Sequence, residues 1–152
     1  MLAETVRSRL ETQFEALFEL LGGVEQDRLE LRPESDKWSI RENIAHLGRY
    51  HEVFLQRMDR ILNEDTPQLG RYSNEEDTEA EAWMILDYHV VLNKLKEQRA
   101  KLITFATGLS AEQLERTGVH PKLGQLSVSM WFEFFLLHEA HHLYRILWLS
   151  RM

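Results

Sequence analysis

Three of the seven histidines in this 152-residue chain fall within five consecutive positions, His138-Glu139-Ala140-His141-His142. On a helix, His138 and His142 are separated by about 40° around the axis and therefore share one face. Side chains one turn apart have Cβ atoms about 5–6 Å apart, so these two imidazoles can bind one divalent metal ion. His141 lies about 100° away from His142 and is expected to be exposed or to lie outside the ligand set.

Two other interpretations of this segment have to be weighed. Two histidines on a buried helix face can be core residues that are joined by hydrogen bonds to an acid between them. The segment is also an H-E-x-x-H motif, in which Glu139 would activate water in a zinc peptidase. A peptidase needs a third ligand downstream, and none of the residues after His142 is His, Asp or Glu. The peptidase interpretation is therefore disfavoured, whereas the ligand spacing still holds.

A metal site that is open to substrate needs a third protein ligand. The candidates outside the terminal segment are His46 and His51, predicted on one helix, with His89 and His120 further along the chain. Apolar periodicity favours His51, which lies within the apolar stripe of its helix, whereas His46 lies about 120° from the centre of that stripe. The residues alone leave the third ligand undecided.

The composition restricts the classes of protein to which the chain can belong. With 43% hydrophobic and 28% charged residues, it is typical of one globular domain, which we expect to span residues 1–152. The absence of cysteine means that any thiol has to come from a small molecule. A net charge of −7 argues against a nucleic-acid partner. No membrane span or signal peptide is evident, so we expect a cytoplasmic protein that acts on a small molecule.

Four segments with helical periodicity must position these histidines. The first covers about residues 2–21 and ends at Gly22-Gly23, because glycine adopts the left-handed cap conformation readily. The second begins at a capping box, with Ser39 as the N-cap and Glu42 three residues later. Because no run alternates with a period of two residues, we expect an all-α protein without a sheet.

The remaining two helices complete the expected bundle. The third begins at another capping box, Thr78 with Glu81, and keeps Ile85 on its buried face. Glycine and proline residues then interrupt the chain before a fourth helix, which runs from about Ser127 to the C-terminus. Each helix is apolar along one stripe, so the four are expected to pack as a four-helix bundle with long crossover loops.

The segment 37–47, Lys-Trp-Ser-Ile-Arg-Glu-Asn-Ile-Ala-His-Leu, resembles the second-helix signature of the DinB/YfiT-like superfamily. The dipeptide His120-Pro121 followed by Gly124, and the ending 138–143, resemble other parts of the same family. The resemblance covers nearly the whole chain, and the two histidine motifs together are more specific than either one alone.

This resemblance implies a DinB/YfiT-like four-helix bundle, often a homodimer, that binds one divalent metal ion, most often zinc or nickel. The implied ligands are His46, His138 and His142. The resemblance thus replaces His51 by His46, because a bundle helix contacts two neighbours and a residue away from the stripe centre can still face the interior. His51 is then expected to orient a ligand or to contact substrate.

Members of the superfamily include a mycothiol-dependent maleylpyruvate isomerase and bacillithiol S-transferases. An open three-histidine site could activate a low-molecular-weight thiol for S-transfer, or water for hydrolysis. Arg99 is expected either to pair with a substrate carboxylate or to form a structural ion pair, and Glu139 either to accept a proton or to form a salt bridge. The alternative is a non-catalytic, metal-binding or ligand-sensing bundle of a stress response.

Overall fold

The structure, a computed structural model, describes all residues from Met1 to Met152 and is built on four long helical segments. The first segment consists of α1 (Glu4–Thr12), a 3-10 turn η1 (Gln13–Glu15) and α2 (Ala16–Leu21), and the others are α4 (Ile40–Asn63), α6 (Tyr88–Thr107) and α8 (Val128–Arg151). The connecting elements are α3 (Gln26–Leu29), η2 (Asn74–Glu76), α5 (Thr78–Met84), α7 (Ala111–Glu115), β1 (Thr117–His120) and β2 (Gly124–Ser127). The predicted four-helix bundle is confirmed.

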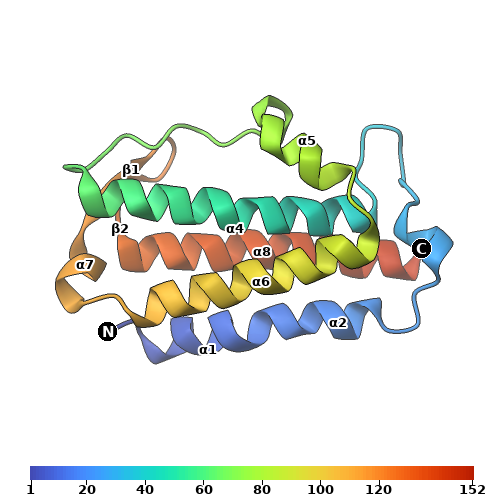
Figure 1. The fold of residues 1–152 in the computed structure, drawn as a ribbon, viewed down its shortest axis with the longest axis horizontal. Coiled ribbons are helices and arrows are strands. Elements are labelled where there is room, and N and C mark those ends of the chain that lie inside the picture. Colours follow the sequence, from blue (N-terminus) through green and yellow to red (C-terminus); the bar gives the residue numbers. More distant parts are fainter.

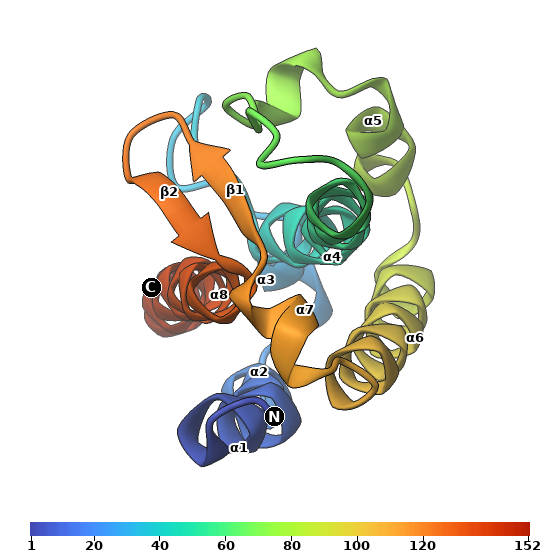
Figure 2. The same cartoon turned by 90° about the vertical axis from the view of Figure 1, so that its left-hand side faces the viewer.

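The four segments lie side by side along the long axis of the molecule (Figure 1). The sequence colours show that α1, α2 and α8 run in one direction, whereas α4 and α6 run in the other. The second and third long segments of the bundle, α4 and α6, are parallel because the connection 64–87, which contains α5, returns along the length of the bundle as a long crossover. Viewed along the bundle, α5 and the β1–β2 hairpin lie outside the four helices (Figure 2). No helix combines the length and the apolar character that crossing a lipid bilayer requires.

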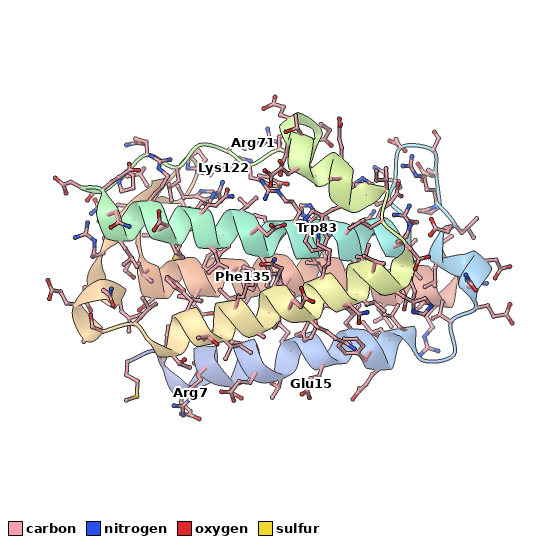
Figure 3. All side chains as sticks on the ribbon, viewed as in Figure 1. Arg7, Glu15, Arg71, Trp83, Lys122 and Phe135 are labelled. Atoms are coloured by element: carbon pink, nitrogen blue, oxygen red, sulfur yellow. The ribbon has the colours of Figure 1, made fainter.

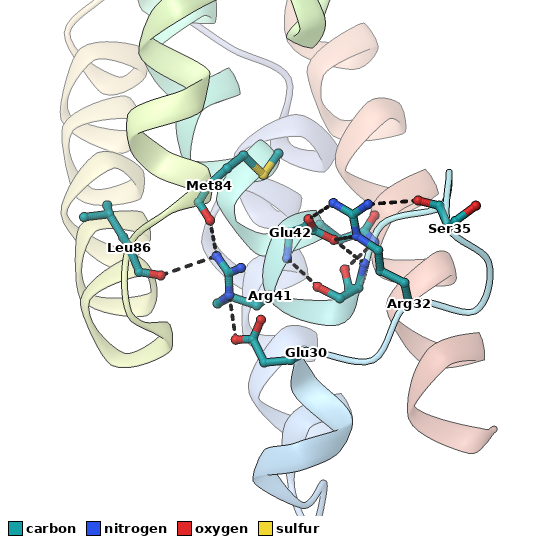
Figure 4. Close-up of polar contacts among 9 residues, drawn as sticks. Glu30, Arg32, Ser35, Arg41, Glu42, Met84 and Leu86 are labelled. Carbon is teal, nitrogen blue, oxygen red and sulfur yellow. Dashed lines mark hydrogen bonds and ion pairs between the residues drawn. The ribbon is translucent and has the colours of Figure 1, made fainter.

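The first turn of α4 is fixed by hydrogen bonds on both sides (Figure 4). The predicted capping box is present: Ser39 Oγ accepts a hydrogen bond from the Glu42 amide, and the Glu42 carboxylate accepts one from the Ser39 amide. Arg32 pairs with the same carboxylate. Arg41 donates to the Glu30 carboxylate and to the backbone carbonyls of Met84 and Leu86. These contacts fix the start of α4 relative to the loop before it and to the end of α5.

The third helix was expected to be continuous, and this expectation was wrong, because the structure divides it into two helices. Helix α5 ends at Met84, and α6 begins at Tyr88. Asp77, not Thr78, caps α5, and the Asp87 carboxylate accepts a hydrogen bond from an amide in the first turn of α6. The side chain of Ile85 is 85% exposed because it lies in the break between the helices. The cap at Asp87 starts a new helix, α6, after the break, so the chain can change direction between α5 and α6.

A β-hairpin precedes α8, contrary to the expectation that the chain forms no sheet. Strands β1 and β2 pair antiparallel, and Gly124 in their turn has a positive φ of 77°. A side chain at Gly118 would lie 2.7 Å from Ile61 on α4, so glycine allows the hairpin to approach that helix. Four-residue strands are too short to show a clear alternation in sequence, and tertiary contacts stabilise them.

The bundle core consists of two apolar clusters with a polar layer between them. Along α8, Phe135 belongs to the first cluster and Leu143 to the second. Glu139 lies between them, and Arg99 on α6 and His51 on α4 are at the same level. These three side chains are only 1%, 2% and 0% exposed. Since buried polar groups need hydrogen-bond partners, the three side chains of this layer are expected to pair with one another.

Gly48 on α4 leaves room for the side chain of Trp83 on α5, which is labelled in Figure 3. The two helices can therefore pack closely against each other. A Cβ atom at Gly48 would lie 2.2 Å from the Trp83 ring, which is buried. Trp83 also donates a hydrogen bond of 2.5 Å to Glu52 on α4. This close approach keeps the crossover against α4.

We expect Gly48→Ala to destabilise the protein by roughly 1–3 kcal/mol, because overpacking a buried ring costs more than the gain of about 1 kcal/mol in helix propensity. Urea unfolding measures the difference in free energy. Gly108→Ala is the matched control, since a Cβ there meets nothing closer than 3.6 Å. Equal stability of the two variants would contradict the assigned role of Gly48.

Candidate metal centre

Three histidines from two packed helices meet beside the polar layer. His46 lies on α4, and His138 and His142 lie on α8; one ring nitrogen of each is within 4.8 Å of the other two. Nε2 of His46 is 3.0 Å from Nε2 of His138. The ring centroid of His142 is 4.5 Å from that of His46 and 4.7 Å from that of His138. The structure thus brings together the three residues that the family resemblance implied.

Two asparagines determine which nitrogens of this cluster face inward. The Asn43 amide donates to the Ser39 carbonyl, which leaves its Oδ1 to accept a hydrogen bond from Nδ1 of His142 at 2.9 Å. Oδ1 of Asn74 accepts from Nδ1 of His46 at 3.2 Å. With Nδ1 protonated in both rings, each Nε2 carries a lone pair. An outer hydrogen bond of this kind is how proteins orient histidine ligands of metals.

The donor set fits a divalent metal ion. Two nitrogens at 3.0 Å repel each other if both carry lone pairs, so a proton or a cation is needed between them. Metal–nitrogen bonds of about 2.0–2.1 Å at tetrahedral angles place two ligand nitrogens roughly 3.3 Å apart. Nδ1 of His138 is buried without a hydrogen-bond partner, so hydrogen bonding within the protein leaves this ring unsatisfied in either tautomer.

Burial keeps the three imidazoles neutral. It lowers the pKa of His46 to about 4, of His138 to about 3 and of His142 to about 2, because desolvation disfavours the imidazolium form. Neutral imidazole is the form that binds a metal ion. The cluster is therefore ready to bind a cation across the physiological pH range without first releasing protons.

These pKa shifts predict that the metal-free protein loses stability in acid. Between the ordinary histidine pKa of 6.5 and the lowered values, the unfolded chain binds more protons than the folded one. Stability is therefore fully present above pH 6.5 and falls as the pH decreases below it. Urea unfolding at about pH 7.5 and about pH 5 tests this expectation before most carboxylates titrate. His142→Gln should reduce the pH dependence, and a wild-type stability that is equal at both pH values would contradict it.

His46 is buried although it lies off the apolar stripe of α4, because the crossover covers that side of the helix. Asn74 in η2 is held next to His46, and Arg49 pairs with Asp77 at 2.7 Å just before α5. Tyr72 donates a hydrogen bond of 2.8 Å to the same carboxylate. A stripe analysis assumes that only neighbouring bundle helices cover α4, so it could not find this third contact surface.

His51, Arg99 and Glu139 form a separate buried network. Arg99 donates to both oxygens of Glu139, at 2.7 and 3.0 Å, and to Nε2 of His51 at 3.2 Å. Nδ1 of His51 donates to the Leu47 carbonyl. No hydrogen bond joins the network to the three-histidine cluster, and none of its residues lines either of the two pockets that are lined by His138 and by His142. In this geometry Arg99 forms the structural ion pair, and it is not placed to pair with a substrate.

The other histidines lie outside the cluster. His89 and His141 are exposed. Nδ1 of His120 accepts hydrogen bonds from the amides of Lys122 and Leu123, so this ring shapes the hairpin turn. None of the three belongs to the group of residues that could share a metal ion.

Two pockets reach the cluster from different histidines. A pocket of about 270 Å³, called here the basic pocket, is lined by Tyr50, Arg57, Arg71, Tyr72, His120, Pro121, Lys122, Phe134 and His138. A second pocket of about 330 Å³, called here the polar pocket, is lined by Asp36, Lys37, Trp38, Asn43, Glu75, His141, His142 and Arg145. Among the residues around these pockets, Arg71, Tyr72, Lys122 and the ligand partner Asn74 could not be predicted from the sequence, because the connections that carry them have no periodicity.

Comparison with known proteins places this chain in a family. The profile of the DinB superfamily matches residues 9–146, so the chain belongs to that superfamily, as the sequence motifs predicted. The chain is 26% identical to YuaE of Bacillus subtilis, over 90% of its own length and 88% of that protein. It is 23% identical to "Putative metal-dependent hydrolase OB0413" of Oceanobacillus iheyensis, over 91% of its own length and 79% of that protein.

Solved structures show the same fold. YfiT from Bacillus subtilis, described as a probable metal-dependent hydrolase with an unusual four-helix bundle topology, superposes with a TM-score of 0.78. The match has 22% identity and covers 97% of this chain and 85% of YfiT. The four-helix bundle protein TT2238 gives a TM-score of 0.67 at 21% identity, covering 94% of this chain and 95% of that one. The parallel arrangement of α4 and α6 is thus part of a recurrent fold.

Proposed function

We propose that this protein is a metal-dependent hydrolase whose divalent ion is held by His46, His138 and His142. The observation that carries the proposal is the meeting of three neutral imidazoles, two of them oriented by asparagine carbonyls. The group contains three side chains, whereas structural zinc sites usually have four protein ligands. Relatives that are named as metal-dependent hydrolases support the same class of reaction.

The residues around the cluster have distinct tasks in this proposal. When bound, a divalent ion supplies a Lewis acid that polarises a carbonyl and lowers the pKa of water or thiol. Tyr50 lies against His138, with ring centroids 4.1 Å apart, and burial raises the pKa of its hydroxyl. Tyr50 therefore keeps its proton and can donate a hydrogen bond to a substrate oxygen. Glu75 in the polar pocket is a carboxylate that can accept a proton.

Metal analysis and an activity screen test the proposal together. Protein purified without a histidine tag should contain about one zinc or nickel ion per chain. Metal-loaded protein should hydrolyse activated esters or amides, and chelator treatment should remove this activity. Metal binding without hydrolysis of any tested ester or amide would contradict the hydrolase assignment and favour the non-catalytic alternative. No bound metal, even after incubation with zinc and nickel, would refute the whole proposal.

S-transfer is a second candidate because two separate pockets reach the cluster, one at His138 and one at His142. Two reactants could approach one centre in this arrangement. Since the chain has no cysteine, the thiol would be a low-molecular-weight cofactor. Thiol conjugation to an electrophile, measured with the metal-loaded and the chelated protein, distinguishes this reaction from hydrolysis.

We also propose that a second copy of this chain covers the exposed face of α8. Met130, Leu137, Tyr144 and Trp148 recur at spacings of seven, seven and four residues and are 51–65% exposed. Such a stripe is typical of a helix seam between subunits. Leu137→Glu should convert a dimer into a monomer in gel filtration, whereas Ile85→Glu, at an exposed site outside α8, should not. A monomeric wild-type protein would refute this arrangement.

A further inference from the structure

The basic pocket collects three cationic side chains from three different segments of an acidic protein. Arg57 lies on α4, Arg71 on the crossover and Lys122 in the hairpin turn, and all three line one pocket together with His138. The labelled Arg71 and Lys122 lie on the same side of the bundle in Figure 3. No carboxylate lines this pocket, although the chain has 25 acidic residues and a net charge of −7.

The positive charges of the pocket are not neutralised by ion pairs. Arg57 donates to the Gly70 carbonyl at 2.8 Å and to the Tyr50 hydroxyl at 3.3 Å, so neutral oxygens hold its guanidinium. None of the three cations forms a salt bridge, whereas Arg9, Arg49 and Arg99 all pair with carboxylates. Unneutralised charges in a concave site raise the local concentration of a ligand of opposite charge.

The protein fixes the positions of these charges through its own backbone. His120 accepts hydrogen bonds from the Lys122 and Leu123 amides and thereby sets the turn that presents Lys122. The hydrogen bond from Arg57 to Gly70 joins α4 to the residue that precedes Arg71. The remaining walls include the rings of Tyr72 and Phe134. The pocket therefore offers positive groups and flat apolar surface next to the three-histidine cluster.

We infer that the basic pocket binds the anionic group of the substrate, a carboxylate or a phosphate on a small, flat apolar body, and places the rest of that molecule at His138. This inference rests on the proposed function. Arg57, Arg71 and Lys122 bind the anion, and the rings of Tyr50, Tyr72 and Phe134 bind the apolar part. The reacting bond then lies on the His138 side of the substrate, since His138 is the member of the cluster that lines this pocket.

Binding of benzoate, phenyl phosphate and uncharged benzamide, measured by calorimetry on metal-free and metal-loaded protein, tests the inference. At least one of the two anions should bind both forms, at least tenfold more tightly than benzamide, and the better one identifies the preferred anionic group. Arg71→Gln and Lys122→Gln should each raise the Kd of that anion about tenfold, because each removes a charge-assisted contact. Lys101→Gln, an exposed substitution on α6 outside the pocket, should leave it unchanged.

The outcomes separate this inference from the proposed function. An anion that binds only the metal-loaded protein, with the same Kd in the Gln variants, would be a metal ligand and would overturn the basic pocket. Equal binding of benzamide, or no binding of either anion, would also overturn it. Metal content is measured on the same samples, so a protein without metal refutes the proposed function, while anion binding to that protein would still support the pocket.

Discussion

Replacing His46, His138 or His142 with alanine, one at a time, is expected to abolish stoichiometric metal binding while the helical fold persists. Each substitution leaves only two imidazoles, and the chain has no cysteine that could compensate. Loss of an outer partner of a ligand typically weakens metal affinity 10–100-fold, so loss of a ligand should cost at least as much. Elemental analysis after gel filtration measures the metal content, and circular dichroism measures the helical signal.

The two asparagines should produce a graded effect. Asn43→Ala and Asn74→Ala remove the acceptors for Nδ1 of His142 and His46, and each should weaken metal binding about 10–100-fold without abolishing it. Asn63→Ala, which removes hydrogen bonds made only to Asp59 on the same helix, is the control.

For the histidine substitutions, one metal ion per chain in all three variants would contradict the assigned ligands and place the ion elsewhere.

His89→Ala provides a control for removing a histidine as such, because His89 is exposed and lies outside the cluster. It should retain the full metal content. If His89→Ala lost metal as completely as His142→Ala, the loss would not report on the ligand set.

Local chemistry made the starts of two long helices, α4 and α8, predictable. Ser39 with Glu42, and Ser127 at the start of α8, cap their helices as short-range hydrogen bonding requires. The break before α6 was not predicted, because the apolar pattern continues through Ile85 even though its side chain faces solvent. A strong N-cap such as Asp87 overrides that pattern by starting a new helix.

The candidate site was only partly predictable from spacing. The pair on α8 follows from its i, i+4 positions, whereas periodicity favoured His51 over His46. The structure places His51 in the buried network of Arg99 and places His46 opposite α8, under the crossover. Which histidine faces which neighbour depends on the long connection 64–87, and its path is determined by contacts distant in sequence, such as Gly48 with Trp83.

Removing one member of the buried ion pair is expected to have the largest effect on stability. Arg99 and Glu139 are 2% and 1% exposed, and two hydrogen bonds join them. Glu139→Leu would leave a buried guanidinium with only the Arg9 and Leu10 carbonyls and His51 as partners. Breaking such a pair typically costs about 3–5 kcal/mol, and Arg99→Met should cost a similar amount. Urea unfolding of the metal-free proteins measures both.

The double variant Arg99→Met/Glu139→Leu should be considerably more stable than the sum of the two single effects predicts. Replacing a buried ion pair with apolar residues of similar volume is often close to neutral, because no charge is left unpaired. Strictly additive losses in this double-mutant cycle would contradict the assignment of the pair as one structural unit.

The same double variant tests the chemical meaning of the H-E-x-x-H segment. In a zinc peptidase the glutamate between the two histidines activates water, so its removal would abolish catalysis while the metal stays bound. Here the Glu139 carboxylate contacts Arg99 on α6 and Gln13 in η1, on a different side of α8 from the histidine cluster. The double variant should therefore keep both its metal ion and its activity. Loss of activity with full metal content would instead assign Glu139 to the reaction, and the ion pair would then hold a catalytic carboxylate.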